Sequence, residues 1–237
     1  MSGAPSLRPG AGRALRAHGL PAAEIMPLSL ERLRRRSPVE LPPEPAASVA
    51  LRMAYAAGDP DLLRDIVIGD GAVDAAAAAL DRGAPLICDV AMVAAGVRTV
   101  MSQRGVQVLC AQDVAGAAMS PALHHDPQTL SAVEYSTRTA RGLLNLAPHW
   151  DGAVIAIGNA PTALLALLDA LADGAPRPAA IIAAPCGLVA AEEAKQLLVD
   201  VAPAPYITVR GTRGGSAVAA AAVNACALLG ATVDATR

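Results

Sequence analysis

The stretch AVIAIGNAPTALLALL, residues Ala153–Leu168, decides the fold of this chain. Val154–Ile157 is a short apolar run rich in β-branched residues, which is typical of a buried parallel strand. Gly158–Asn159 interrupts the run, and Pro161 suits the first turn of a helix, where its missing N–H costs nothing. The first N–H groups of such a helix are unpaired and attract anionic ligands. The stretch alone leaves open whether it binds a ligand or is one more βα unit of a core.

Four further apolar runs have the same form, and a helical segment follows each of them. They are Leu86–Cys88, Val106–Cys110, Ala179–Ala184 and Tyr206–Val209. Five strands that alternate with helices predict an α/β fold in which a parallel sheet is covered on both faces. Because crossovers are right-handed, we expect a doubly wound sheet in the order 2-1-3-4-5. Ligands then bind where the order reverses, beside Cys88–Asp89 and Ile157–Asn159.

An N-terminal arm precedes the predicted sheet. We expect residues 1–45 to hold a flexible N-terminus, a basic helical arm and a Pro-rich linker, and residues 46–237 to form the α/β domain. Ile66–Ile68 reads as an extended stretch without a place in the sheet. The predicted helices are Ala22–Arg36, Ala46–Ala57 ending at Gly58, Val73–Asp81, Met92–Ala95, Leu130–Leu146, Ala190–Leu198 and an Ala-rich helix from Ser216 to Leu229.

Charge is distributed unevenly along the 237 residues. The first 36 residues carry seven Arg against two Glu, a formal charge of +5, while the rest carries −7. A basic arm on an acidic body suits docking onto a second subunit or an acidic ligand, or is simply a solvated basic helix. The net charge of −2 and the 2% aromatic content argue against nucleic-acid binding.

The four cysteines favour a reducing compartment. Cys88, Cys110, Cys186 and Cys226 form no CxxC pair, and no His lies at ligand spacing to them. We therefore expect free thiols in a cytoplasmic protein and no metal site. The N-terminus lacks the apolar core of a signal peptide, and the Ala-rich C-terminal run is too weakly hydrophobic for a membrane span.

Polar residues at the predicted strand ends are the candidates for chemistry. Asp89 either caps the following helix or binds ligand N–H groups. Arg138 either pairs with a ligand carboxylate or forms a surface ion pair. The loop RGTRGGS, Arg210–Ser216, combines three Gly, two Arg and a Ser suited to cap a helix, so it reads as an anion site or a tight turn. The adjacent residues His124 and His125 read as solvated.

Five segments of the chain, taken in order, resemble the precorrin-8X methylmutase (precorrin isomerase) family of cobalamin biosynthesis. They are ICDVAMVAAGV (Ile87–Val97), STRTA (Ser136–Ala140), VIAIGNAPTALLALL (Val154–Leu168), RPAAIIAAPCGLVAAEEAK (Arg177–Lys195) and RGTRGGSAVAAAAVNA (Arg210–Ala225). The resemblance covers most of Arg52–Ala225, and the ordered set rather than any single motif carries it.

The resemblance implies a flavodoxin-like three-layer sandwich that acts as a homodimer. It also implies an isomerase that moves a methyl group from C-11 to C-12 of a corrin precursor, precorrin-8X or its cobalt form, to give hydrogenobyrinate or cobyrinate. The shift is intramolecular, and it implies no cofactor. The tetrapyrrole substrate carries many carboxylates, which Arg side chains would suit. The implied substrate-binding residues are Ser29, Asp89, Met92, Arg138, Asn159, Thr162, Arg210, Gly214, Gly215 and Ser216.

Tyr55 occupies the position of the family's general acid. The family segment resembles R-M-(V/I)-H-A-(C/S)-G, whereas this chain has RMAYAAG at Arg52–Gly58. The resemblance therefore implies Tyr55 as the catalytic residue in place of His. A phenol has an ordinary pKa near 10 against about 6.5 for imidazole, so it is the weaker acid, although it donates a hydrogen bond readily.

Two other functions remain open from the sequence. The chain could be a catalytically impaired paralogue that binds a tetrapyrrole or corrinoid as carrier or partner subunit. It could also be a nucleotide-binding domain, but the Gly-rich loop matches neither GxGxxG nor GxxxxGK[ST].

Overall fold

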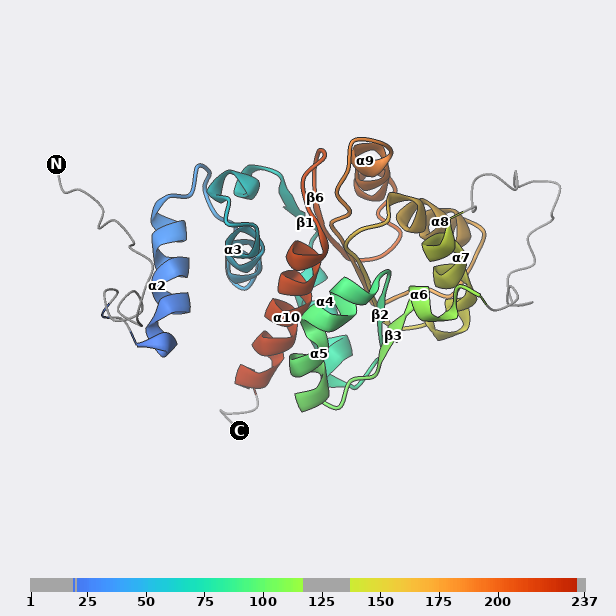
Figure 1. The fold of residues 1–237 in the computed structure, drawn as a ribbon, viewed down its shortest axis with the longest axis horizontal. Helices are drawn as coiled ribbons and strands as arrows, with labels where there is room; N and C mark the ends of the chain where they lie inside the picture. The colour runs from blue at the N-terminus through green and yellow to red at the C-terminus, as the bar shows by residue number, and fades with distance from the viewer. Residues whose placement is uncertain (1–18, 20, 117–136, 234–237) are drawn as a thin grey trace, which may run out of the picture.

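The computed structural model describes residues 19, 21–116 and 137–233, and in this part of the chain one sheet lies between two layers of helices (Figure 1). The α/β three-layer fold predicted from the sequence is confirmed. The sheet has six strands rather than five. They are β1 (Ile66–Ile68), β2 (Leu86–Cys88), β3 (Val108–Cys110), β4 (Val154–Ile157), β5 (Ala180–Ala183) and β6 (Tyr206–Val209).

The order of the sheet is β1-β6-β5-β4-β2-β3. The five strands β2 to β6 are parallel and keep the relative order 2-1-3-4-5. The predicted count and full order were wrong because β1 adds a sixth, antiparallel strand, in which Val67 pairs with Thr208. Ile66–Ile68 is extended as expected, but its place in the sheet depends on the long-range pairing with β6.

Helices α3, α4, α5 and α10 cover one face of the sheet, and α7, α8 and α9 cover the other (Figure 1). The helix bounds are α2 (Ala22–Arg35), α3 (Ala46–Ala57), α4 (Ala72–Asp81), α5 (Ala91–Gln103), α6 (Ala111–Val114), α7 (Arg138–Asn145), α8 (Pro161–Ala172), α9 (Ala191–Val201) and α10 (Ser216–Val233). Two short 3-10 helices are η1 (Pro60–Arg64) and η2 (Ala147–His149). The predicted helix from Leu130 starts at Arg138 in the described residues, with Thr137 as its N-cap.

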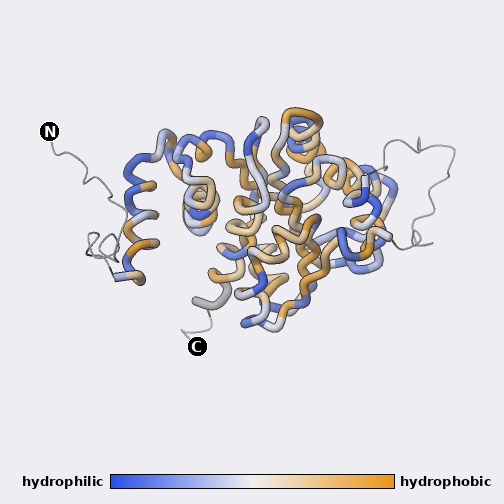
Figure 2. Tube along the Cα trace, in the orientation of Figure 1, coloured by the Kyte–Doolittle hydropathy of each residue, from blue (hydrophilic) through white to orange (hydrophobic). Residues whose placement is uncertain are grey.

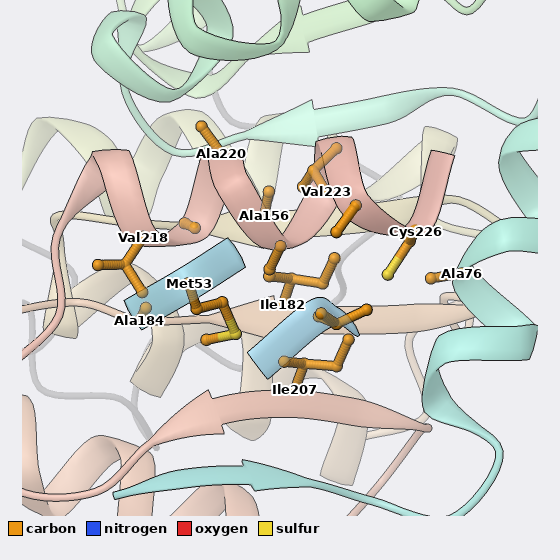
Figure 3. Close-up of a cluster of buried hydrophobic side chains, with 14 of the residues drawn as sticks. Met53, Ala76, Ala156, Ile182, Ala184, Ile207, Val218, Ala220, Val223 and Cys226 are labelled. Carbon is orange, nitrogen blue, oxygen red and sulfur yellow. The ribbon is translucent and has the colours of Figure 1, made fainter. Parts of the chain in front are cut away.

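Side chains on each strand alternate between the two apolar clusters, as the pleat of a strand requires. Ile155 and Ile157 join the cluster under α7, α8 and α9, whereas Ala156 joins the cluster under α10. Figure 3 shows Ile182 and Ile207 of the sheet facing the same interior as Val223 of α10. In Figure 2 the strands are hydrophobic and the outer turns are polar. The continuous apolar strands of the sequence therefore fill both halves of the core.

The arm helix α2 lies beside α3 on the outside of the molecule (Figure 1). Leu33 is its buried residue and joins the cluster under α10, and Arg34 forms an ion pair with Glu44 of the linker. Three of the four cysteines are buried, and the thiol of Cys186 is exposed; all four are free. Within the described residues, every helix is too short or too polar to span a bilayer.

Candidate functional site

Asp89 follows β2 and holds the turn after β4, at the carboxyl ends of these two neighbouring strands. Its carboxylate accepts four backbone N–H groups, two on each oxygen. Oδ1 accepts from Val90 (2.9 Å) and Gly158 (3.0 Å), and Oδ2 accepts from Asn159 (2.8 Å) and Ala160 (2.9 Å). The sequence left open whether Asp89 caps a helix or binds a ligand. The structure assigns it to the backbone at the start of α8.

Asp89 is fully buried. Burial raises the pKa of the Asp89 carboxyl above its ordinary value, and the four N–H donors oppose part of that rise. Asp89 therefore positions the turn at Gly158–Asn159, where the side chain of Asn159 is exposed, and direct substrate binding by Asp89 stays a prediction.

Three predicted residues lie around this turn. The side chain of Asn159 is exposed, and Met92 on the first turn of α5 is 64% exposed. Thr162 on the first turn of α8 shares a 2.8 Å hydrogen bond with the hydroxyl of Thr137, the N-cap of α7. This bond joins the starts of α7 and α8. Asn159 thus presents a polar group and Met92 an apolar group at the carboxyl ends of β4 and β2, where the strand order reverses.

Arg138 lies beside the same edge. Its Nη2 donates to the carbonyl of Gln112 at 3.1 Å, and the side chain of Gln112 accepts from the N–H of Ala91 at 3.1 Å. Gln112 therefore connects Arg138 to the start of α5, next to Met92. The sequence did not single out Gln112, because a lone Gln after a strand carries no motif. Arg138 is exposed, and within the described part of the chain its guanidinium donates only to the carbonyl of Gln112.

The Gly-rich loop Arg210–Ser216 packs against the ends of β4 and β5. A Cβ on Gly214, at φ +144°, would lie 2.3 Å from the carbonyl oxygen of Ala184. A Cβ on Gly158 would lie 2.7 Å from the Cα of Ser216. These contacts explain why glycine is required at both positions. They also bring the end of the Gly-rich loop to the turn that Asp89 holds.

The structure corrects two expectations for this loop, which concern Ser216 and Arg213. Helix α10 begins at Ser216, so Ser216 is its first residue rather than its N-cap. The Ser216 hydroxyl is buried and has no hydrogen-bond partner among the described residues, and the N–H of Gly215 donates to Ala184 (2.7 Å). Arg213, expected to add positive charge for an anion, forms ion pairs with Asp59 and Asp65 instead.

Tyr55 and Ser29 line one cavity of about 250 Å³ between α2 and the end of α3. The two residues come from different helices, and the family resemblance implies both of them as site residues. Arg32 and Arg36 of the arm line the same cavity. Tyr55 is 40% exposed and borders this cavity. The arm thus brings two cations to the predicted proton donor.

Arg210 lies elsewhere. It borders a larger cavity of about 770 Å³ between the Pro-rich linker and the connection from β1 to α4. Its backbone N–H donates to the carbonyl of Asp65 at 2.7 Å. The structure therefore separates Arg210 from Tyr55 and Ser29, and substrate binding by Arg210 stays a prediction. His124 and His125 lie outside the described residues.

Lys195 is a buried residue near the Gly-rich loop that the sequence did not indicate. It is fully buried on α9, and its Nζ donates to the carbonyl of Arg213 at 2.7 Å. Burial lowers the pKa of Lys195 from 10.5 to about 8. In the sequence it follows two Glu on an amphipathic helix and looks solvated. Only the packing of α9 under the Gly-rich loop makes it internal.

Comparisons with known proteins identify the family of this chain. The sequence profile of the family described as precorrin-8X methylmutase matches residues 24–229. A precorrin-8X methylmutase of Sinorhizobium sp. is 42% identical over 187 residues, which cover 78% of this chain and 83% of the relative. One of Pseudomonas aeruginosa is 41% identical, with 78% and 85% covered.

Solved structures lead to the same family. The crystal structure of a precorrin-8X methylmutase from Thermus thermophilus superposes with a TM-score of 0.75 at 28% identity, covering 90% of this chain and 98% of that one. The family match spans both the arm that carries Ser29 and the Gly-rich loop. This chain belongs to the precorrin-8X methylmutase family, whose members are isomerases.

Proposed function

We propose that this chain moves a methyl group from C-11 to C-12 of precorrin-8X, or of its cobalt form, to give hydrogenobyrinate or cobyrinate. The carbon–methyl bond at C-11 breaks and a new one forms at C-12, so substrate and product are isomers. The chain then needs to bind the macrocycle, supply a proton donor near ring C and neutralise peripheral carboxylates. Its own residues provide groups for each of these tasks.

The observation that carries the proposal is the cavity shared by Tyr55 and Ser29. In our proposal Tyr55 donates a proton or a short hydrogen bond to the ring system, and Ser29 contacts the substrate beside it. The cavity of about 250 Å³ is smaller than a tetrapyrrole, so it receives an edge of the macrocycle. Because substrate and product are isomers, a proton given by Tyr55 is balanced by one lost from the ring system.

The carboxylates of the substrate find cations on two sides. Arg32 and Arg36 line the Tyr55 cavity, and Arg138 lies exposed at the switch point. A guanidinium binds a carboxylate through two parallel N–H groups, which fixes orientation as well as charge. Met92 adds an exposed apolar surface at the switch point, suited to the macrocycle.

We further propose that the chain acts in the cytoplasm as a homodimer, and that residues 46–237 form the tetrapyrrole-binding domain to which the arm is attached. The free thiols support a reducing compartment. The exposed apolar residues Ile25 and Met26 on α2 support an arm that meets a second subunit.

A catalytically impaired corrinoid-binding protein is the second candidate, and the Tyr at the acid position favours it. Incubating the purified chain with precorrin-8X and recording the visible spectrum separates the two functions. Appearance of the corrin chromophore supports the isomerase. Tight binding of hydrogenobyrinate without turnover supports the binding protein, and failure to bind either tetrapyrrole contradicts both.

A further inference from the structure

Arg213 belongs to the Gly-rich loop, but its guanidinium contacts a distant segment. It forms ion pairs with Asp59 and Asp65, which lie about 150 residues earlier in the chain. Its Nε donates to Oδ2 of Asp65 at 3.1 Å, and its Nη2 donates to the carbonyl of Asp61 at 3.2 Å. All of these acceptors lie in the connection between α3 and β1. The guanidinium therefore joins that connection to the Gly-rich loop.

The α3 side of this junction carries Tyr55. Helix α3 ends at Gly58, which is in the left-handed region at φ +65° and whose N–H donates to the carbonyl of Tyr55 at 3.0 Å. Asp59 comes next, and its Oδ1 accepts the N–H of Asp61 at 2.9 Å, which caps η1. The N–H of Asp59 donates to the carbonyl of Ala54 at 3.2 Å. Holding Asp59 therefore holds the last turn of α3, on which Tyr55 lies.

The opposite side of the junction is anchored to the sheet. The carbonyl of Arg213 accepts from Nζ of the buried Lys195 at 2.7 Å. The carbonyl of Thr212 accepts from Gly187 at 3.1 Å, and Gly215 donates to Ala184 at 2.7 Å. The backbone on both sides of Arg213 is thus fixed to the end of β5 and to α9. A guanidinium that extends from so rigid a base can hold another segment in place.

We propose that Arg213 is a positioning residue that clamps the end of α3, and with it Tyr55, to the Gly-rich loop. The proton donor and the loop then face the substrate as one rigid frame. The expected effect of Arg213 on kcat rests on the proposed function, whereas its effect on the end of α3 rests on the contacts alone. Only a planar fork of donors reaches two carboxylates and a carbonyl at once, so Lys would replace Arg213 incompletely.

Global stability does not explain this arrangement. The side chains of Arg213, Asp59 and Asp65 are 40%, 37% and 31% exposed. Ion pairs that exposed are screened by water and contribute little to folding. Their effect falls instead on the local geometry of the two segments they join, and a small displacement of a catalytic group is costly in rate.

The test compares Arg213→Met and Arg213→Lys with a matched control, Arg64→Met. Arg64 forms an exposed ion pair with Asp61 inside the 3-10 helix η1, so this pair does not join η1 to the Gly-rich loop. We expect Arg213→Met to lower kcat for precorrin-8X by about tenfold to a hundredfold with a KM change below about threefold. Arg213→Lys recovers part of kcat, and Arg64→Met resembles the parent. A raised KM with unchanged kcat, or equal losses in Arg213→Met and Arg64→Met, would overturn the proposal.

A second readout needs no turnover. Amide hydrogen exchange at Gly58 and Asp59 reports the last turn of α3 directly. We expect faster exchange there in Arg213→Met than in the parent or in Arg64→Met. Unchanged exchange at these two amides overturns the clamp even if the parent is active. Faster exchange in a parent that fails to turn over precorrin-8X supports the clamp and contradicts only the proposed isomerase activity.

Discussion

Two buried charged side chains, Asp89 and Lys195, shape the candidate site without facing it. Each holds backbone groups of a loop that carries exposed candidates: Asp89 holds the turn at Asn159, and Lys195 holds the Gly-rich loop at Arg213. A buried charge is costly unless its hydrogen bonds are satisfied. Both residues satisfy this condition by hydrogen-bonding to loop backbone at the carboxyl ends of the strands, which fixes the shape of the loops.

Removing the carboxylate of Asp89 leaves four backbone N–H groups without an acceptor. We expect Asp89→Ala to lower the free energy of unfolding by about 4 kcal/mol, and Asp89→Asn, which keeps one accepting oxygen, by less. Denaturation in urea measures the change. Asp113 also follows a parallel strand but is exposed, so Asp113→Ala should change stability by no more than about 0.5 kcal/mol. Equal effects at both positions would contradict the role assigned to Asp89.

Lys195 should make stability depend on alkaline pH. Its pKa is about 8 in the folded chain against 10.5 ordinarily, so between these values the unfolded chain binds a proton that the folded chain lacks. The free energy of unfolding should therefore rise as pH increases through this window, by up to about 3 kcal/mol. Lys195→Met removes this contribution. Denaturation of both proteins from pH 7.5 to 10 checks it, and parallel pH profiles would exclude a depressed pKa.

At the scale of elements, close packing of loops on strand ends decides the shape of the site. The strands could be predicted from the sequence because β-branched runs such as Val154–Ile157 and Tyr206–Val209 are short, apolar and followed by turns. The pairing of β1 with β6 could not, because Ile66–Ile68 and Ile207–Val209 lie far apart in the chain and only the fold brings them together. Nor could the clamp, because the partners of Arg213 lie about 150 residues away and only the fold brings them together.

A comparison of Gly214 with Gly211 distinguishes the effect of close packing from the effect of backbone conformation within one loop. Both have positive φ, but a Cβ on Gly214 meets the carbonyl of Ala184 at 2.3 Å, whereas one on Gly211 meets nothing within 4 Å. We expect Gly214→Ala to lower the free energy of unfolding by roughly 3 kcal/mol and Gly211→Ala by about 1 kcal/mol. Thermal unfolding of the two variants side by side measures the difference. If Gly211→Ala were the more harmful, close approach to β5 would not be what requires Gly214.

At the scale of the whole molecule, the candidate residues of the three-layer fold lie at the carboxyl ends of the parallel strands and on the arm helix α2 with the adjoining end of α3. The family could be predicted from the ordered motifs, whereas a ligand site at the switch point stays a prediction. The shared cavity of Ser29 and Tyr55 could not be predicted from the sequence, because it depends on how α2 lies against α3. The role of Arg210 could not be resolved from sequence, since a flexible side chain at a strand end can turn either way.

The central claim is that Tyr55 supplies the proton donor. The most direct measurement is the rate of corrin chromophore formation from precorrin-8X by the parent, Tyr55→Phe and Tyr55→His, with hydrogenobyrinate affinity recorded for each. We predict that Tyr55→Phe, which keeps the ring but removes the hydroxyl, loses at least about a hundredfold in kcat while product affinity stays within about threefold. Tyr55→His should retain or exceed the parent rate, because imidazole is the stronger acid. A Tyr55→Phe variant as fast as the parent would contradict the account.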